Sequence, residues 1–171
     1  GIVTVNFYVD VVPLPPALQS GWLVIHVFVA SLATSFFALA AGLSILQLVR
    51  ARLEAHEMAK ARLMKTIPAS SVLEALAYRL NVVGFVLWTF TLIAGAIWAE
   101  RAWGRYWGWD TKEVWTFVIW VLFAGYVHAR ATRGWRGSRS AWLGIIGFGA
   151  VLFNYTVVNI AFTGLRPSSE L

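Results

Sequence analysis

The stretch GWLVIHVFVASLATSFFALAAGLSILQLV, residues 21–49, decides the class of fold. It contains no Lys, Arg, Asp or Glu. It also exceeds the roughly 20 apolar residues with which an α-helix crosses the hydrocarbon core of a bilayer. Its one ionisable side chain is His26, and Ser20 in front of it is suited to cap a helix. The stretch therefore predicts a transmembrane helix with an ionisable residue inside it.

The whole chain has the composition of a polytopic membrane protein. Hydrophobic residues make up 59% of it and charged residues 13%, and the mean hydropathy is +0.68, whereas soluble domains are about 25% charged. Further apolar stretches predict spans at residues 81–98, 114–129 and 141–163. We therefore expect an all-α polytopic membrane protein with about four transmembrane helices. The chain has no cysteine, which excludes disulfides and thiolate metal ligands.

Prolines and charges mark the segments outside these spans. The prolines of VVPLPPAL, within residues 1–17, prevent a continuous helix there. The motif Ser71-Val-Leu-Glu74 has the form of a capping box and predicts a short amphipathic helix that ends near Arg79. The chain begins on Gly1 without a basic segment ahead of an apolar run, so we interpret it as a piece of a longer protein.

The basic residues predict how the chain is oriented in the membrane. Ten of the fourteen Lys and Arg residues fall within residues 50–79 and 130–139, which four alternating spans place on one side. The positive-inside rule makes that side cytoplasmic. The segment 98–120 and both ends of the chain are then extracytoplasmic. The positive charge thus reflects orientation, and we expect no nucleic-acid binding.

The segment WGRYWGWDTKEVW, residues 103–115, combines indoles with charges. Six of the ten tryptophans lie between Trp98 and Trp120, more than an interfacial aromatic belt explains. Indoles that stack on a ring, beside cations that pair carboxylates, suit a large planar dianionic ligand. Haem has this description, and a quinone or a lipid headgroup fits part of it. Asp110, three residues before Glu113, is equally suited to cap a helix that begins near Thr111.

Two of the three histidines fall inside predicted spans. His26 lies near the outer end of the first span and His128 near the inner end of the third, whereas His56 lies in the charged segment and receives no role. An ionisable residue inside a span is by default a functional-site hypothesis, and the alternative is a histidine that packs helices or reaches the headgroups. Small residues one turn away, such as Gly125 and Ala124 beside His128, would leave a hollow next to the imidazole. Neutral imidazole would be the natural iron ligand of a flat cofactor in such a hollow.

The segment WGRYWGWDTKEVWTFVIWVLFAGYVHAR, residues 103–130, resembles the tryptophan-rich WWD signature of haem-handling proteins. The chain as a whole resembles the system II cytochrome c biogenesis proteins of the CcsA/ResC type, with further support from PALQSGWLVIHV and LAYRLNVVGFVLWTFTLIAGAIWAE. The resemblance covers nearly the whole chain and is most specific over residues 98–130. It implies that residues 1–171 form a single membrane-embedded haem-handling domain, the C-terminal part of a longer protein. Residues 98–120 would be its WWD segment.

The resemblance also implies roles for individual residues. His26 would be the first of two extracytoplasmic histidines that ligate haem, and His128 the membrane histidine that takes part in haem passage from the cytoplasmic side. The segment in contact with haem would include Trp103, Trp107, Trp109 and Asp110. The basic residues nearest to it in sequence, and so the candidates for pairing the propionates, are Arg101 and Arg105.

The implied function is to transport haem b and present it to apocytochrome c, at the CxxCH motif, for covalent attachment at the outer face. The chain would act as a subunit of a cytochrome c synthase (haem lyase), not as a stand-alone enzyme, with a ResB-type (CcsB-like) membrane partner. Its place would be the lipid bilayer of the bacterial cytoplasmic membrane, or of the thylakoid in a plastid. Two alternatives stay open: a haem exporter or chaperone of the CcmC kind, and a membrane scaffold without haem.

One position departs from the pattern of that family. The second outer histidine follows the segment matched by NIAFTGL, residues 159–165, and here Arg166 stands at that place. A guanidinium stays protonated and cannot ligate iron. Residues 1–171 therefore do not complete a pair of outer histidine ligands.

Overall fold

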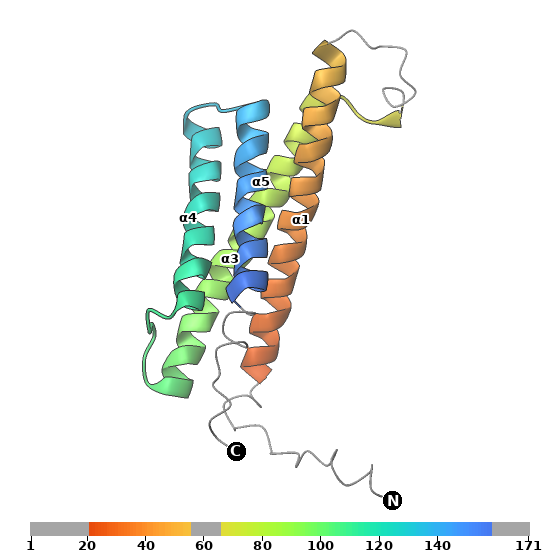
Figure 1. The fold of residues 1–171 in the computed structure, drawn as a ribbon. Coiled ribbons are helices and arrows are strands. Elements are labelled where there is room, and N and C mark those ends of the chain that lie inside the picture. Colours follow the sequence, from red (N-terminus) through yellow and green to blue (C-terminus); the bar gives the residue numbers. More distant parts are fainter. Residues whose placement is uncertain (1–20, 56–65, 159–171) are drawn as a thin grey trace, which may run out of the picture.

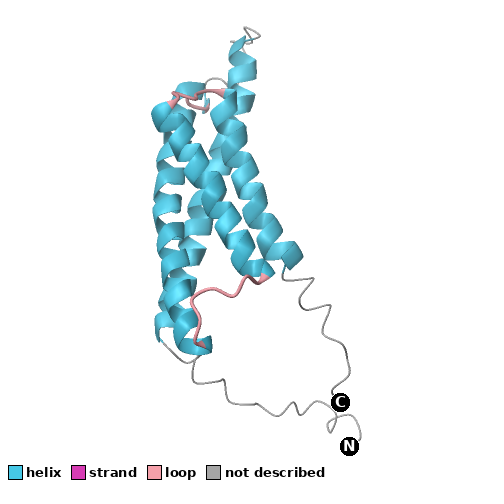
Figure 2. Cartoon of the chain, turned by 90° about the vertical axis from the view of Figure 1, so that its left-hand side faces the viewer, coloured by secondary structure: helices cyan, strands magenta, loops and turns pink. Residues whose placement is uncertain are grey.

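The structure of the chain, a computed structural model, describes residues 21–55 and 66–158. The α-helices of these residues are α1 (Gly21–Ala55), α3 (Ser70–Trp103), α4 (Thr111–Thr132) and α5 (Ser138–Phe153), and the π-helical turn η3 (Asn154–Val158) continues α5. The helices alternate in direction and form an elongated bundle (Figure 1). Figure 2 shows the loops that join α3 to α4 and α4 to α5. The predicted all-α class is confirmed.

Three of the described helices are long and apolar enough to cross a membrane: α1, α3 and α4. The fourth predicted span begins as α5, which has 16 residues, and its part beyond Val158 lies outside the described residues. Residues 1–17, Ser20 and His56 lie outside them too. The described helices bear out a polytopic membrane protein.

The region between the first two spans differs from the prediction. The amphipathic helix expected from Ser71 and the span expected from residue 81 are a single helix, α3. Its N-cap is Ala69, with no side-chain cap, so the capping-box interpretation was wrong. No Gly or Pro interrupts the residues between the two predicted elements, and one helix therefore continues. The Ser70 hydroxyl instead donates to Glu54 Oε2 of α1 at 2.6 Å.

The middle of the bundle is closely packed with apolar side chains. The rings of Phe37 and Phe123 stack with their centroids 3.7 Å apart and their planes 7° from parallel. The indole nitrogen of Trp88 donates to the Thr116 carbonyl at 3.1 Å, so this large side chain is buried without an unpaired donor. The packing allows no side chain at residue 147, because a Cβ on Gly147 would lie 2.9 Å from Phe123 Cζ. The fully buried members of this core are Ala33, Phe37, Trp88, Ile119, Phe123 and Val151.

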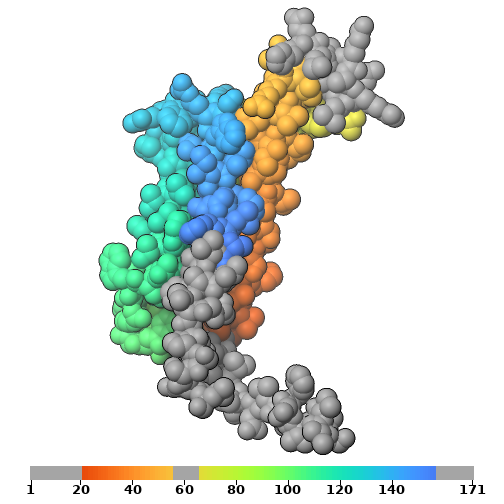
Figure 3. Space-filling view, in the orientation of Figure 1, coloured from red at the N-terminus to blue at the C-terminus, as the bar shows by residue number. Residues whose placement is uncertain are grey.

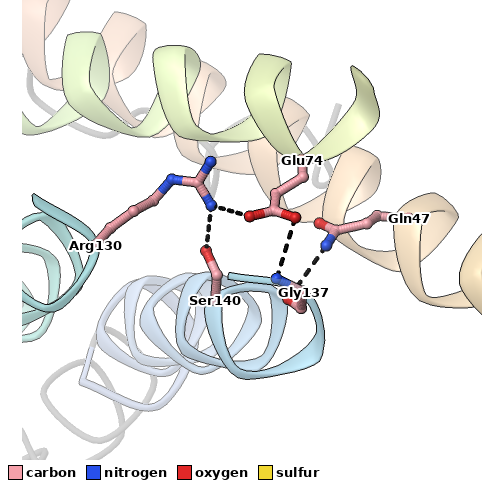
Figure 4. Close-up of polar contacts among 5 residues, drawn as sticks. All are labelled: Gln47, Glu74, Arg130, Gly137 and Ser140. Carbon is pink, nitrogen blue, oxygen red and sulfur yellow. Dashed lines mark hydrogen bonds and ion pairs between the residues drawn. The ribbon is translucent and has the colours of Figure 1, made fainter. Parts of the chain in front are cut away.

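A polar network joins all four helices near the α4–α5 loop (Figure 4). The Arg130 guanidinium pairs with Glu74 and donates to Ser140 Oγ at 3.1 Å. Glu74 Oε2 accepts from the Gly137 N–H at 3.1 Å, and the Gly137 carbonyl accepts from Gln47 Nε2 at 3.2 Å. One largely buried carboxylate thus links α3 to α4 and to the start of α5.

The bundle has two chemically different ends. The C-terminal end of α1, the start of α3 and the α4–α5 loop lie together at one end, and the α3–α4 loop with its tryptophans lies at the other (Figure 1). The space-filling view shows α1, α5 and α4 side by side along one face (Figure 3). The two predicted basic segments therefore flank the same end of the bundle, as the orientation argument requires, while the sidedness itself stays a prediction.

Candidate functional site

A cleft of about 390 Å³ lies at the tryptophan end of the bundle. That volume is within the range of small-molecule sites in proteins, about 300–1,000 Å³. Helices α1, α3 and α4, the α3–α4 loop and the start of η3 all contribute to its lining. The polar or charged members of that lining are His26, Ser31, Thr91, Tyr106, Asp110, Lys112, Glu113, Thr116, Asn154 and Tyr155.

His26 contributes its imidazole to this cleft from α1. The ring packs against Gly95 of α3, where a Cβ would lie 3.0 Å from His26 Cε1. His26 Nδ1 is buried and has no hydrogen-bond partner among the described residues. This part of α1 is held to α3 by the Trp22 indole, which donates to the Ala94 carbonyl at 3.2 Å. The helix pair therefore presents a half-buried imidazole, the side chain proteins most often use as a metal ligand.

The indoles of the WWD segment divide into two groups. Trp103 and Trp107 line the cleft together with Trp98, and Trp98 and Trp103 meet edge to face with their centroids 4.8 Å apart. Trp109 does not line it: its side chain is 79% exposed and meets Trp107 edge to face at 6.0 Å. The cleft thus has an aromatic wall, and the other indoles of the segment, Trp109, Trp115 and Trp120, do not line it.

The α3–α4 loop is shaped by backbone turns and caps. Gly104 ends α3 in the left-handed region with φ 68°, as is usual for a helix C-terminus. The predicted cap by Asp110 is confirmed, because its carboxylate accepts from the Glu113 N–H at 2.8 Å. The Glu113 carboxylate accepts from the Gly108 N–H at 2.6 Å, and so fixes the loop as well as the helix. Trp109, between Gly108 and Asp110, has φ 59°, which is a strained conformation for a bulky residue.

The cation in the cleft is one that sequence reasoning missed. Neither Arg101 nor Arg105 lines the cleft, and the Arg105 guanidinium lies against Gly108, where it would overlap a Cβ. Lys112, in the first turn of α4, does line it. It shares a helix face with Thr116, four residues on, which also lines the cleft, and this grouping is visible only in the structure.

His128 lies far along α4 from this cleft, near the polar network. Its side chain is exposed, and the expected hollow beside it opens on the outside of the bundle, since a Cβ on Gly125 would have no neighbour within 4 Å. The two histidines are therefore not brought together within residues 21–55 and 66–158. In the same ranges no three His, Asp or Glu side chains are grouped so as to hold a metal ion. Arg166 lies outside the described residues, and the roles of both histidines stay predictions.

Gly95 provides a direct test of how tightly the imidazole is placed. A methyl group at this position would require the His26 ring to move by a few tenths of an ångström, so we expect Gly95→Ala to displace it while α3 stays folded. Ligand affinity should fall by roughly tenfold, because binding sites need their groups held within about 0.5 Å. Titration of the variant with haem, the ligand that the resemblance implies, measures the effect. Gly125→Ala, which meets nothing, is the control, and equal affinities of the two variants would contradict the placement.

Comparison with known proteins identifies the family. The sequence profile described as Cytochrome C assembly protein matches residues 3–166. The chain is 42% identical over 168 residues to the "Cytochrome c biogenesis protein CcsA" of Guillardia theta, and the match covers 90% of the chain and 56% of that protein. It is 41% identical over 154 residues to the CcsA protein of Chlamydomonas reinhardtii, with 90% and 42% covered, and 37% identical over 174 residues to that of Synechococcus sp. (strain CC9902), with 90% and 57% covered.

The chain spans about half the length of these curated relatives. The match to the family profile includes every described helix as well as the α3–α4 loop. A profile match over nearly all of the chain, together with these identities, is sufficient to assign it. The chain belongs to the cytochrome c assembly protein family.

Proposed function

We propose that the chain binds haem b in the cleft at the tryptophan end and presents it for attachment to apocytochrome c. The observation that carries this proposal is the juxtaposition of His26, which has a buried unpaired Nδ1, with an indole-lined wall and one cation. A haem needs the same three things: an axial nitrogen, flat apolar surface, and a positive charge for its carboxylates. The family to which the chain belongs supports haem over a quinone.

Each lining group has a role in this proposal. His26 ligates the iron, and an imidazole ligand with its surroundings sets the reduction potential. The indoles of Trp98, Trp103 and Trp107 contact the macrocycle. Lys112 pairs with a propionate in place of the expected Arg101 and Arg105. Asp110 acts indirectly, because as the cap of α4 it fixes the start of the helix and so the position of Lys112 in its first turn.

The wider process needs more than the described residues. We propose that the chain is a membrane subunit of a cytochrome c synthase that acts with a ResB-type (CcsB-like) partner on apocytochromes with a CxxCH motif. The tryptophan end would face the extracytoplasmic side, as the positive-inside rule places it. His128, exposed on α4, would take part in haem passage at the other end.

The first test is the absorbance spectrum of the detergent-purified full chain. We expect a Soret band that changes on reduction with dithionite, and b-type haem in a pyridine haemochrome assay. Lys112→Gln should weaken haem binding severalfold, whereas Arg101→Gln should not, because Arg101 does not line the cleft. A chain that acquires no haem, even when haem is added, would reject the proposal in favour of a scaffold.

The synthase role has a separate test. The chain is produced in cells with a ResB-type subunit and an apocytochrome that carries CxxCH, and covalently attached haem is detected by haem staining of a denaturing gel. We expect attachment only when both membrane proteins are present. Haem binding without any dependence of attachment on the partner would favour an exporter of the CcmC kind.

A further inference from the structure

Two asparagines of the bundle have side chains that are almost fully buried but incompletely paired. Asn81 is 1% exposed and Asn154 is 4% exposed. Neither Oδ1 atom has a hydrogen-bond partner among the described residues. A buried amide without a partner costs several kcal/mol in an apolar surrounding. Such a group is rare in native proteins, so each needs an explanation.

Only one of the two belongs to the lining of the cleft. Asn154 lines the cleft, whereas Asn81 does not and instead faces Gly144, where a Cβ would lie 3.3 Å from its Nδ2. The backbone N–H of Asn154 is already paired, since it donates to the carbonyls of Ala150 and Val151. The atom of Asn154 that lacks a hydrogen-bond partner is therefore the side-chain Oδ1.

The local backbone also sets Asn154 apart. It is the residue at which α5 changes into the π-helical turn η3, and such turns are frequent at functional sites. One turn earlier, Val151 is fully buried in the apolar core, and Trp88 belongs both to that core and to the cleft lining. Asn154 thus stands at the inner end of the cleft, where the cleft meets the core.

We infer that Asn154 is a further ligand-binding residue, whose carboxamide hydrogen-bonds a polar group of the molecule held in the cleft. The inference rests on the proposed haem-binding function and adds a contact from the α5 side to those from α1, α3 and α4. The carboxamide oxygen is a hydrogen-bond acceptor, so its partner on the ligand is a donor, such as the hydroxyl of a protonated carboxyl group. In the absence of the ligand this amide is a cost to folding, which the bound state recovers.

The test uses the full chain purified in detergent, titrated with ferric haem. Asn154→Leu removes the amide at similar volume, and Asn81→Leu makes the same change at the buried asparagine outside the cleft. We expect the Kd of Asn154→Leu to rise about tenfold, as for the loss of one hydrogen bond, with a shifted Soret maximum. The melting temperature without haem should stay equal or rise, because an unpaired amide has been removed. Asn81→Leu should keep the wild-type Kd and Soret maximum.

Several outcomes would overturn the inference. One is an Asn154→Leu variant that binds haem with the wild-type Kd. Another is an Asn154→Leu variant whose weaker binding is accompanied by a lower melting temperature of the haem-free chain. Asn154→Ala, which adds no bulk, replaces the leucine variant if that chain does not fold. A wild-type chain that binds no haem rejects the proposed function and this inference together. If the wild-type chain binds haem and Asn154→Leu binds it with the same Kd, the inference is rejected and the proposed function stands.

Discussion

His26→Ala is expected to abolish most haem binding by the full chain. The imidazole is the one histidine side chain that lines the described cleft, and its removal leaves no nitrogen ligand of this type there. We expect the Kd for haem to rise at least about a hundredfold, which corresponds to about 2.7 kcal/mol. The Soret band of the protein as isolated should be lost or strongly weakened, while the helical content measured by circular dichroism stays unchanged.

The control for this variant is His56→Ala, the same change at a histidine to which no role is assigned. Imidazole added to the His26→Ala protein should restore part of the Soret band, since the space left by the side chain is open to the cleft. Retention of the wild-type spectrum by His26→Ala would contradict the assignment of His26 as an axial ligand, because packing alone would then account for the residue.

Arg130→Met is expected to cause the largest loss of stability of any change near the α4–α5 loop. The side chains of Arg130 and Glu74 are only 14% and 13% exposed. Removal of the guanidinium therefore leaves a largely buried carboxylate without its ion-pair partner, with only the Gly137 N–H still donating to it. Breaking such a buried pair typically costs 3–5 kcal/mol. The free energy of unfolding in detergent, obtained by chemical denaturation, should fall by about this amount.

Arg136→Met is the matched control, because Arg136 is exposed on the same loop and surface substitutions usually change stability by less than about 0.5 kcal/mol. The double variant Glu74→Gln with Arg130→Met should recover part of the loss, since no buried charge is then left unpaired. Equal stabilities of Arg130→Met and Arg136→Met would mean that the network in Figure 4 contributes little to folding.

Much of the bundle could be predicted from hydropathy, because long apolar stretches directly indicate helices that span a bilayer. The residues at which the helices begin and end could not be predicted in this way. Glu54 belongs to the charged segment after the first predicted span and Glu74 to a predicted short helix, yet each is inside a long helix and has a partner on another element. Those partners lie 16 and 63 residues away along the chain, and pairings at such distances are not visible in local patterns.

The site could be predicted only in part, because some of its residues are defined by how the chain folds and packs and not by local sequence patterns. His26 and the segment around Trp107 could be recognised from their residue types, and the Asp110 cap from its spacing. The choice of Lys112 over Arg105 depends on how the α3–α4 loop folds onto Gly108, and nearness in sequence was a poor guide to it. Asn154 carries no signal in the sequence at all, because only the packed structure reveals that its oxygen lacks a partner.

The apolar core between the two ends of the bundle limits how a large molecule could move from one end to the other. Phe37 and Phe123 stack across the middle of the described helices, and both are fully buried. A molecule as broad as a porphyrin could pass between the ends only if these rings were pulled apart, at the cost of the packing that holds α1 to α4. Such a molecule therefore has no open path between the two ends through the middle of the described helices. The described core thus closes the middle of the bundle to a molecule of this size.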